Sequence, residues 1–301
     1  MTGIGDIDQD GVPDLVIGNP AFSTFNRYPG SVFLYSGRTG DNIPGPSMDG
    51  EHDLSLFGVT VAATTDLDGD GLADFFVGAS NYTTTEADSL GKVYAFSSAT
   101  RLPIWTRVGP QPHNALGGHI AVVGDASGDG VPDLVVGSGA PLAFPEGTAD
   151  AAVLSGADGS VVRLLRAKPG VNGLDTLHAV ADYDGDGCTD VVGMRDFRSE
   201  AYLLSARTGL PLALFKHAYA VVSTGAGPTA RLAVGPGYFE VVAGPVPILD
   251  CLGFVPTAVV EVLPPASFTP SAGLAAAIAD DGLLDAGSYV WFLRRRAGLM
   301  P

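Results

Sequence analysis

The sequence predicts an all-β fold, a β-propeller of four-stranded blades, with five to six blades in this chain. Three observations predict it: an acidic loop that returns at a nearly constant spacing, a short apolar run after each copy of the loop, and no sustained helical periodicity. The 41 glycines and 22 prolines suit a chain of short strands and tight turns. A β-sandwich with decorated hairpins is the alternative, but it has no reason to repeat at a constant period.

The acidic loop occurs four times, in residues 6–14, 66–74, 125–133 and 182–190. Each copy has an oxygen-bearing side chain at positions 1, 3, 5 and 9 and glycine at position 6. Carboxylates packed so closely repel one another, and a hard divalent cation removes that repulsion. An all-oxygen set of ligands favours Ca²⁺, so the sequence predicts up to four structural calcium ions. Acidic surface turns without metal are the alternative.

The predicted metal ligands are the side chains at positions 1, 3, 5 and 9 and the backbone carbonyl at position 7. By loop, they are Asp6, Asp8, Asp10, Val12 and Asp14; Asp66, Asp68, Asp70, Leu72 and Asp74; Asp125, Ser127, Asp129, Val131 and Asp133; and Asp182, Asp184, Asp186, Cys188 and Asp190.

A helix-flanked EF-hand loop begins in the same way but needs a bidentate glutamate at position 12. Position 12 is instead Ile17, Val77, Val136 or Gly193, so this reading fails in all four copies. Short apolar runs rich in β-branched and aromatic residues follow the loops, and they predict strands.

Further elements recur after each loop in the same order. A glycine closes the post-loop strand, a third strand follows, as at residues 30–35 and 91–96, and a tight turn such as Ser36 to Gly40 ends it. A last apolar segment, as at residues 103–105 and 210–214, supplies the fourth strand. Four short strands in about 60 residues are typical of a propeller blade.

The phrase Phe57-Gly58, the loop at residues 66–74 and the phrase Gly78-Ala79 together resemble an FG-GAP repeat, the unit of the integrin α-subunit propeller. Similar repeats occur in bacterial secreted and surface proteins. The resemblance covers residues 1–215 and implies Ca²⁺ at the side chains and carbonyls given above. It also implies seven blades, whereas this chain holds five to six, so two alternatives stay open: an incomplete seven-bladed ring, or a ring in which the C-terminal strands complete the first blade.

The pattern divides the chain into two regions. Residues 1–218 hold the blades with four calcium loops, and residues 219–301 are predicted to form degenerate blades without full calcium loops. A small separate β-domain is the alternative for the second region. Cys188 and Cys251 leave two states open, a disulfide between blades or separate thiols.

Net charge and hydropathy limit the partners. The formal charge of −17 argues against nucleic acid, and no apolar run reaches the ~20 residues of a spanning helix. We expect no membrane insertion. Because weak calcium sites suit extracellular conditions, we expect a secreted or cell-surface protein, although this chain shows no signal peptide.

No nucleophile elbow, zinc-ligand pair or phosphate loop is visible, so the sequence predicts a non-catalytic, calcium-stabilised adhesion module for a protein or a glycan. In the resemblance, ligands meet the end opposite the metal loops, on connectors 19–29, 79–90, 138–150 and 194–200. The candidate binding residues there, expected at exposed positions, are Phe25, Arg27, Tyr28, Tyr82, Phe144, Arg195 and Phe197.

Three alternatives to ligand binding stay open. The connectors could merely pack on one another, or the chain could be a passive spacer in a surface protein. It could also be the scaffold or active domain of a polysaccharide-cleaving enzyme, for which the acidic residues of the same connectors could supply paired carboxylates: Glu86, Asp88, Glu146 and Asp150.

Overall fold

A computed structural model describes residues 1–20, 28–84, 89–138, 141–145, 147–167, 173–174, 176–195, 200–216, 220–224, 231–235 and 260–261. The chain divides into two compact units, Met1–Leu165 with Val171–Leu177 and Arg166–Gly170 with His178–Pro301. We describe each unit by itself.

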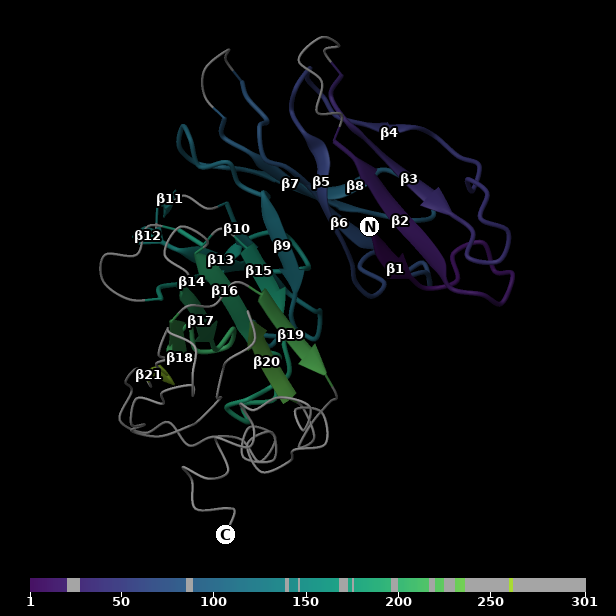
Figure 1. Cartoon of the computed structure of the whole chain (residues 1–301). Coiled ribbons are helices and arrows are strands. Elements are labelled where there is room, and N and C mark those ends of the chain that lie inside the picture. Colours follow the sequence, from purple (N-terminus) through teal and green to yellow (C-terminus); the bar gives the residue numbers. More distant parts are fainter. Residues whose placement is uncertain are drawn as a thin grey trace. The chain divides into compact units, whose positions relative to one another are not determined.

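Three antiparallel four-stranded sheets lie in the first unit (Figure 1). The first joins β1 (Thr2–Ile4), β2 (Asp14–Asn19), β3 (Ser31–Tyr35) and β4 (Met48–Asp49) in chain order. The second joins β5 (Phe57–Ala63), β6 (Phe75–Ala79), β7 (Lys92–Phe96) and β8 (Pro103–Val108). The third joins β9 (His119–Val122), β10 (Leu134–Gly137), β13 (Ala151–Leu154) and β14 (Val161–Leu165), with a hairpin of β11 (Leu142–Phe144) and β12 (Gly147–Ala149) between its second and third strands.

The second unit repeats the same meander. Its sheet runs in the order β15 (Thr176–Ala179), β16 (Val191–Arg195), β17 (Glu200–Leu204), β18 (Pro211–Lys216) and β21 (Val260–Glu261), and the division between the units falls within β15, after Leu177. A separate pair joins β19 (Ala220–Thr224) and β20 (Arg231–Gly235). Almost all of residues 236–301 lie outside the described part, so the degenerate blades predicted there remain a prediction.

Alternation along β6 and β7 builds the core of the first unit, because successive side chains point to opposite faces of a sheet. Phe75, Val77 and Phe96 join a buried cluster with Val16 and Leu34 of the first sheet. On the other face, a second buried cluster joins the second sheet to the third through Phe76, Val93 and Ala95 and through Leu134, Val136, Ala152 and Leu154. The three sheets therefore pack face to face in chain order.

Close backbone contacts hold successive sheets at one end. A Cβ added to Gly18 would lie 2.0 Å from the carbonyl oxygen of Gly58, and one added to Gly78 would lie 2.0 Å from that of Gly117. Gly58 and Gly117 themselves have φ values of 84° and 86°, which side-chain-bearing residues rarely adopt. Glycine is thus required on both sides of each contact. Gly18 and Gly78 have no space for a side chain, and Gly58 and Gly117 have a backbone conformation that favours glycine.

Strand directions place the connectors. Each acidic loop joins the first strand of a sheet to the second, so antiparallel pairing puts the connector between the second and third strands at the other end. That connector is closed by direct pairing of its flanking residues, Asn19 with Ser31 and Ala79 with Lys92. We call these the loop end and the connector end of a sheet.

The all-β prediction is confirmed, and so are the four-stranded sheets of the first unit, while β21 adds a fifth strand to the sheet of the second. The closed ring and the number of blades remain predictions. Within the described residues, no helix has the length and hydropathy needed to cross a membrane.

Candidate metal sites

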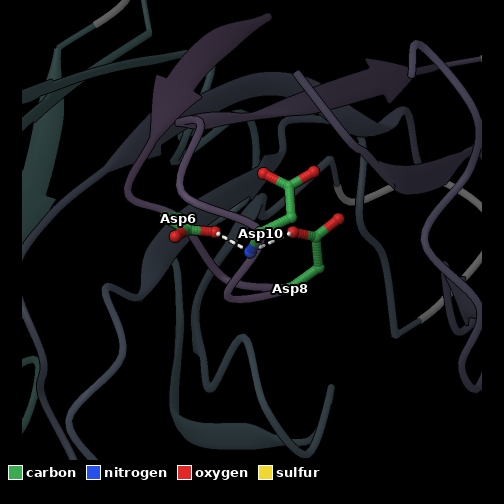
Figure 2. A group of neighbouring side chains, drawn as sticks. All are labelled: Asp6, Asp8 and Asp10. Carbon is green, nitrogen blue, oxygen red and sulfur yellow. Dashed lines mark hydrogen bonds between the residues drawn. The ribbon is translucent and has the colours of Figure 1, made fainter. Parts of the chain in front are cut away.

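The four acidic loops occupy equivalent places, between the first and second strands of four successive sheets. In the first loop, Figure 2 shows the backbone amide of Asp10 between two carboxylates. It donates to Oδ1 of Asp6 at 2.9 Å and to Oδ1 of Asp8 at 3.1 Å. The chain therefore folds back on itself within five residues and gathers its carboxylates around one point.

Position 1 anchors the turn. The amide of the position-6 glycine donates to Oδ2 of the position-1 aspartate in every loop, at 2.8 Å for Gly11 and Gly71 and 2.9 Å for Gly130 and Gly187. These bonds favour the ionised carboxylate, and the bond from Gly71 to Asp66 lowers the pKa of that carboxyl below its usual range. In the third loop, the bond from Gly130 lowers the pKa of Asp125 in the same way.

Glycine at position 6 is in the left-handed region in all four loops, with φ between 86° and 90°. Position 4 is left-handed too, as Gly69, Gly128 and Gly185 in the later loops and as Gln9, with φ of 61°, in the first. The sequence analysis missed this second requirement, although glycine at position 4 in three of four loops was the signal for it.

The position-9 aspartates, Asp14, Asp74, Asp133 and Asp190, are at most 1% exposed. Oδ2 of Asp74 accepts a bond from the amide of Leu67 at 2.7 Å, and its Oδ1 accepts one from the amide of Ser98 at 2.9 Å. Ser98 belongs to the turn after the third strand. Asp14 and Asp133 make the same bonds to the turns at Gly37 and Gly156, so position 9 fastens the acidic loop to a turn of its own sheet.

The fourth loop departs from this scheme. Oδ2 of Asp190 accepts a bond from the amide of Tyr183 at 2.7 Å, but its buried Oδ1 has no hydrogen-bond partner among the described residues. Burial, and then the nearby charge of Asp184, raise the pKa of Asp190 to about 9. An unpartnered oxygen this deeply buried is costly, and a bound cation would satisfy it.

Three loops bring carboxylate oxygens within 4.8 Å of one another: Asp6, Asp8 and Asp10; Asp66, Asp68 and Asp70; and Asp182, Asp184 and Asp190. These three clusters could hold metal ions. Among the described residues, the third loop forms no such group of three, since Ser127 occupies position 3 and donates to Oδ1 of Asp125 at 3.2 Å.

At position 7, the backbone amides donate to the position-5 carboxylate, as Val12 does to Asp10 at 2.9 Å and Leu72 to Asp70 at 2.8 Å. Val131 and Cys188 do the same at 2.8 Å. Coordination by the position-7 carbonyls stays a prediction. Cys188 is buried, and Cys251 lies outside the described residues.

The turn after the third strand supplies contacts that the sequence analysis did not find. The hydroxyls of Ser36, Ser155 and Ser205 donate to the position-5 carboxylates Asp10, Asp129 and Asp186, at 3.3, 3.3 and 3.1 Å. Arg38 also forms an ion pair with Asp10, and Arg207 one with Asp186. In the sequence, the only signal for these contacts was that the same turn recurs after the third strand of each repeat.

Of the candidate ligand-binding residues, some are exposed as expected and others are buried. Tyr28 is 58% exposed, as expected, whereas Tyr82 and Phe144 are 7% and 4% exposed, so their expected exposure was wrong. Tyr82 packs against His52 and Lys92, and Phe144 lies under the guanidinium of Arg107. Phe25, Arg27, Phe197 and the side chain of Arg195 lie outside the described part of the chain.

Of the carboxylates considered for glycoside chemistry, the structure describes only Asp150. It is 5% exposed and accepts a bond from the amide of Gly173 at 3.0 Å. Glu86, Asp88 and Glu146 lie outside the described residues, so paired carboxylates at the connectors remain untested.

Comparison with known proteins finds similarity to integrin α subunits. The chain is 36% identical over 91 residues to integrin alpha-5 of Xenopus laevis, covering 28% of this chain and 8% of that protein. It is 35% identical over 118 residues to mouse integrin alpha-IIb (36% of this chain, 11% of that protein) and 31% identical over 140 residues to human integrin alpha-6 (44% and 12%). The matches thus span about a tenth of the length of these relatives.

Among solved structures, the exotype rhamnogalacturonan lyase YesX aligns with 75% of this chain and 42% of its own, at 18% identity and a TM-score of 0.41. Residues 2–35 and 57–96 match the FG-GAP repeat family, and they include the first two acidic loops and the strands around them. Two segments of the chain therefore match the FG-GAP repeat family, and the chain has distant similarity to integrin α subunits.

Proposed function

We propose that this chain is a non-catalytic binding module, stabilised by up to four structural Ca²⁺ ions, that recognises a protein or a glycan outside the cell. The observation that carries the cation assignment is in the fourth loop, where a buried carboxylate oxygen of Asp190, close to Asp182 and Asp184, has no hydrogen-bond partner among the residues that the structure describes. The equivalent loops repeat the same backbone turn.

Calcium is the cation that these ligands suit best, because every side chain offered is an oxygen donor. In the first three loops, the position-9 aspartate accepts backbone bonds from the loop and from the turn after the third strand, so as a ligand it would connect both segments to the cation. A bound ion would neutralise the gathered carboxylates and join the loop to the turn that position 9 holds.

We further propose that the sheets are blades of a propeller. The outer face of the first sheet supports this, since Leu15, Ile17, Phe33 and Tyr35 stand at the register positions that Phe75, Val77, Tyr94 and Phe96 hold in the second sheet. In the second sheet that face is buried against its neighbour, whereas Phe33 is 37% exposed. The first sheet thus presents the residue pattern of a blade that packs on a further sheet.

The connector end is the proposed ligand surface. Tyr28 and Leu54 are exposed there, at 58% and 37%, and the amide of Leu54 donates to the carbonyl of Tyr28 at 3.1 Å. Tyrosine is one of the residues enriched among those that dominate binding interfaces, so an exposed tyrosine at this end favours ligand binding there. The distant similarity to adhesion receptor subunits supports the extracellular setting.

Chelation tests the cation assignment. A cation that binds only the folded protein stabilises it in proportion to the logarithm of its concentration. Differential scanning calorimetry measures the melting temperature. We expect it to fall when EDTA is added, to recover with excess Ca²⁺, and to recover less with Mg²⁺. Equal melting temperatures with EDTA and with Ca²⁺ would contradict the assignment.

Arrays of polysaccharides and matrix proteins test the binding function, with product assays in the same wells. We expect retention without products, and we expect Tyr28→Ala to weaken it at least about tenfold, as for a central interface residue. Leu102→Ala is the matched control, because Leu102 is 62% exposed but lies in a turn at the loop end. New reducing ends or unsaturated sugars would show an enzyme, and equal effects of both variants would exclude the connector end.

A further inference from the structure

The turn after the third strand has the same backbone bonds in all four repeats but a different third residue. In each turn, the amide of the fifth residue donates to the carbonyl of the first at 2.9 Å, as from Gly40 to Ser36 and from Arg101 to Ser97. The third residue is Arg38 in the first repeat and Arg207 in the fourth, whereas it is Ala99 and Ala157 in the second and third. The difference is therefore one of charge at a fixed place beside the acidic loop.

Both arginines contact a predicted cation ligand. Nε of Arg38 lies 3.1 Å from Oδ2 of Asp10, and its Nη2 donates to the backbone carbonyl of Asp10. Nε of Arg207 lies 3.9 Å from Oδ1 of Asp186, the equivalent residue of the fourth loop. In the second repeat, the short side chain of Ala99 cannot reach Asp70.

A guanidinium at this place acts on the loop with and without its cation. Without the cation, it offsets part of the repulsion among the carboxylates and stabilises the empty loop. With the cation, the same positive charge would repel it, since the arginine contacts one of the proposed ligands. Since the empty loop gains more than the filled one, the arginine lowers the affinity for the cation.

We propose that Arg38 and Arg207 are built-in counter-charges that lower the calcium affinity of the first and fourth loops, so that the four loops fill over different concentration ranges. This rests on the proposed cation function. The second loop has a carboxylate at every side-chain position and Ala99 beside it, so it fills at the lowest concentration. The third loop also has alanine in its turn but lacks the position-3 carboxylate.

The loops can be followed one at a time by NMR. The amides of Gly11, Gly71, Gly130 and Gly187 each donate to the position-1 carboxylate of their own loop, so each resonance moves when that loop binds a cation. A CaCl₂ titration of the ¹⁵N-labelled chain therefore gives four separate midpoints. For the wild-type protein, we expect Gly71 to have the lowest.

Two substitutions then test the effect of the charge, one by removing the arginine beside the first loop and one by adding an arginine beside the second. Arg38→Gln should move the Gly11 midpoint to a Ca²⁺ concentration about 3- to 10-fold lower, from loss of Coulomb repulsion at low salt, and leave Gly71 unchanged. Ala99→Arg should raise the Gly71 midpoint by a similar factor. Arg38→Lys keeps the charge and should stay close to wild type.

The outcomes separate the two proposals. If no glycine resonance of the wild-type protein moves with Ca²⁺, the cation function fails and this inference fails with it. If the wild-type resonances move but Arg38→Gln and Ala99→Arg leave their midpoints in place, only the inference is overturned. A shift in Arg38→Lys as large as that in Arg38→Gln would also overturn it, since charge would not be the cause.

Discussion

At the residue scale, the position-9 aspartate does more than offer a ligand. In three loops its two oxygens accept backbone bonds from the loop and from a turn of the same sheet, so it is a structural residue whether or not a cation is present. Burial raises the pKa of Asp74 and Asp133, which shows the cost of keeping these carboxyls ionised away from water. Asp190 has the largest cost and the most incomplete set of bonds.

Asp190 makes the stability of the metal-free protein depend on pH. Its pKa is about 9 in the folded protein and about 4 in an unfolded chain, so the folded state holds an extra proton between these values. This contribution to the free energy of unfolding is complete below about pH 4 and is lost as the pH rises through 9.

Asp190→Asn should remove that pH dependence, because an asparagine resembles the protonated carboxyl and cannot ionise. Urea unfolding in EDTA at pH 6, 7 and 8 measures the effect. We expect the free energy of unfolding of the variant to rise relative to that of the wild type as the pH rises. In excess Ca²⁺, the variant should instead be the less stable protein. A difference between the two proteins that does not change with pH would count against the buried ionisation.

At the scale of the element, each acidic loop is a turn with two left-handed positions, and the first loop meets one of them with Gln9. A side-chain-bearing residue in this region costs about 1 kcal/mol. The strand pairing on both sides of the loop holds the conformation nonetheless, and the other three loops have glycine at this place.

Gln9→Gly should therefore stabilise the metal-free protein by up to about 1 kcal/mol. The gain is reduced because glycine gives the unfolded chain more conformational entropy. Chemical unfolding measures it. Gly69→Gln, the reverse change in the second loop, is the matched control and should destabilise by a similar amount. Destabilisation by Gln9→Gly would mean that the Gln9 side chain makes a contact that outweighs the strain.

At the scale of the whole molecule, sheets stacked face to face depend on glycine pairs that bring the backbone of one sheet onto the next. Gly78→Ala would drive a methyl group into the carbonyl oxygen of Gly117. We expect a loss of about 2–3 kcal/mol, the cost of overpacking a tight contact. Gly3→Ala is the control, since a Cβ there meets nothing within 4 Å, and its melting temperature should stay near that of the wild type.

Local repetition made the acidic loops, the strands after them and the all-β class predictable, because each depends on residues close in sequence. Contacts between segments far apart in the sequence could not be predicted. Asp14 bonds to Gly37, which is 23 residues away, and Arg38 reaches Asp10 only because the turn and the loop share one end of a sheet. Tyr82 and Phe144 looked exposed on their connectors, but packing on His52 and Arg107 buries them.

The pairing that closes each connector also fixes what can change at that end of a sheet. Asn19 pairs with Ser31, Ala79 with Lys92 and Arg195 with Glu200, while the segments between them, 20–30, 80–91 and 196–199, differ in length and sequence. The strands deliver the two ends of a connector at one spacing, whatever lies between. Foreign peptides grafted into the connector between Ala79 and Lys92, beyond the buried Tyr82, would therefore start and finish on a rigid frame at the other end of the sheet from the carboxylates proposed to hold the cation, which makes this repeat a scaffold for new recognition surfaces.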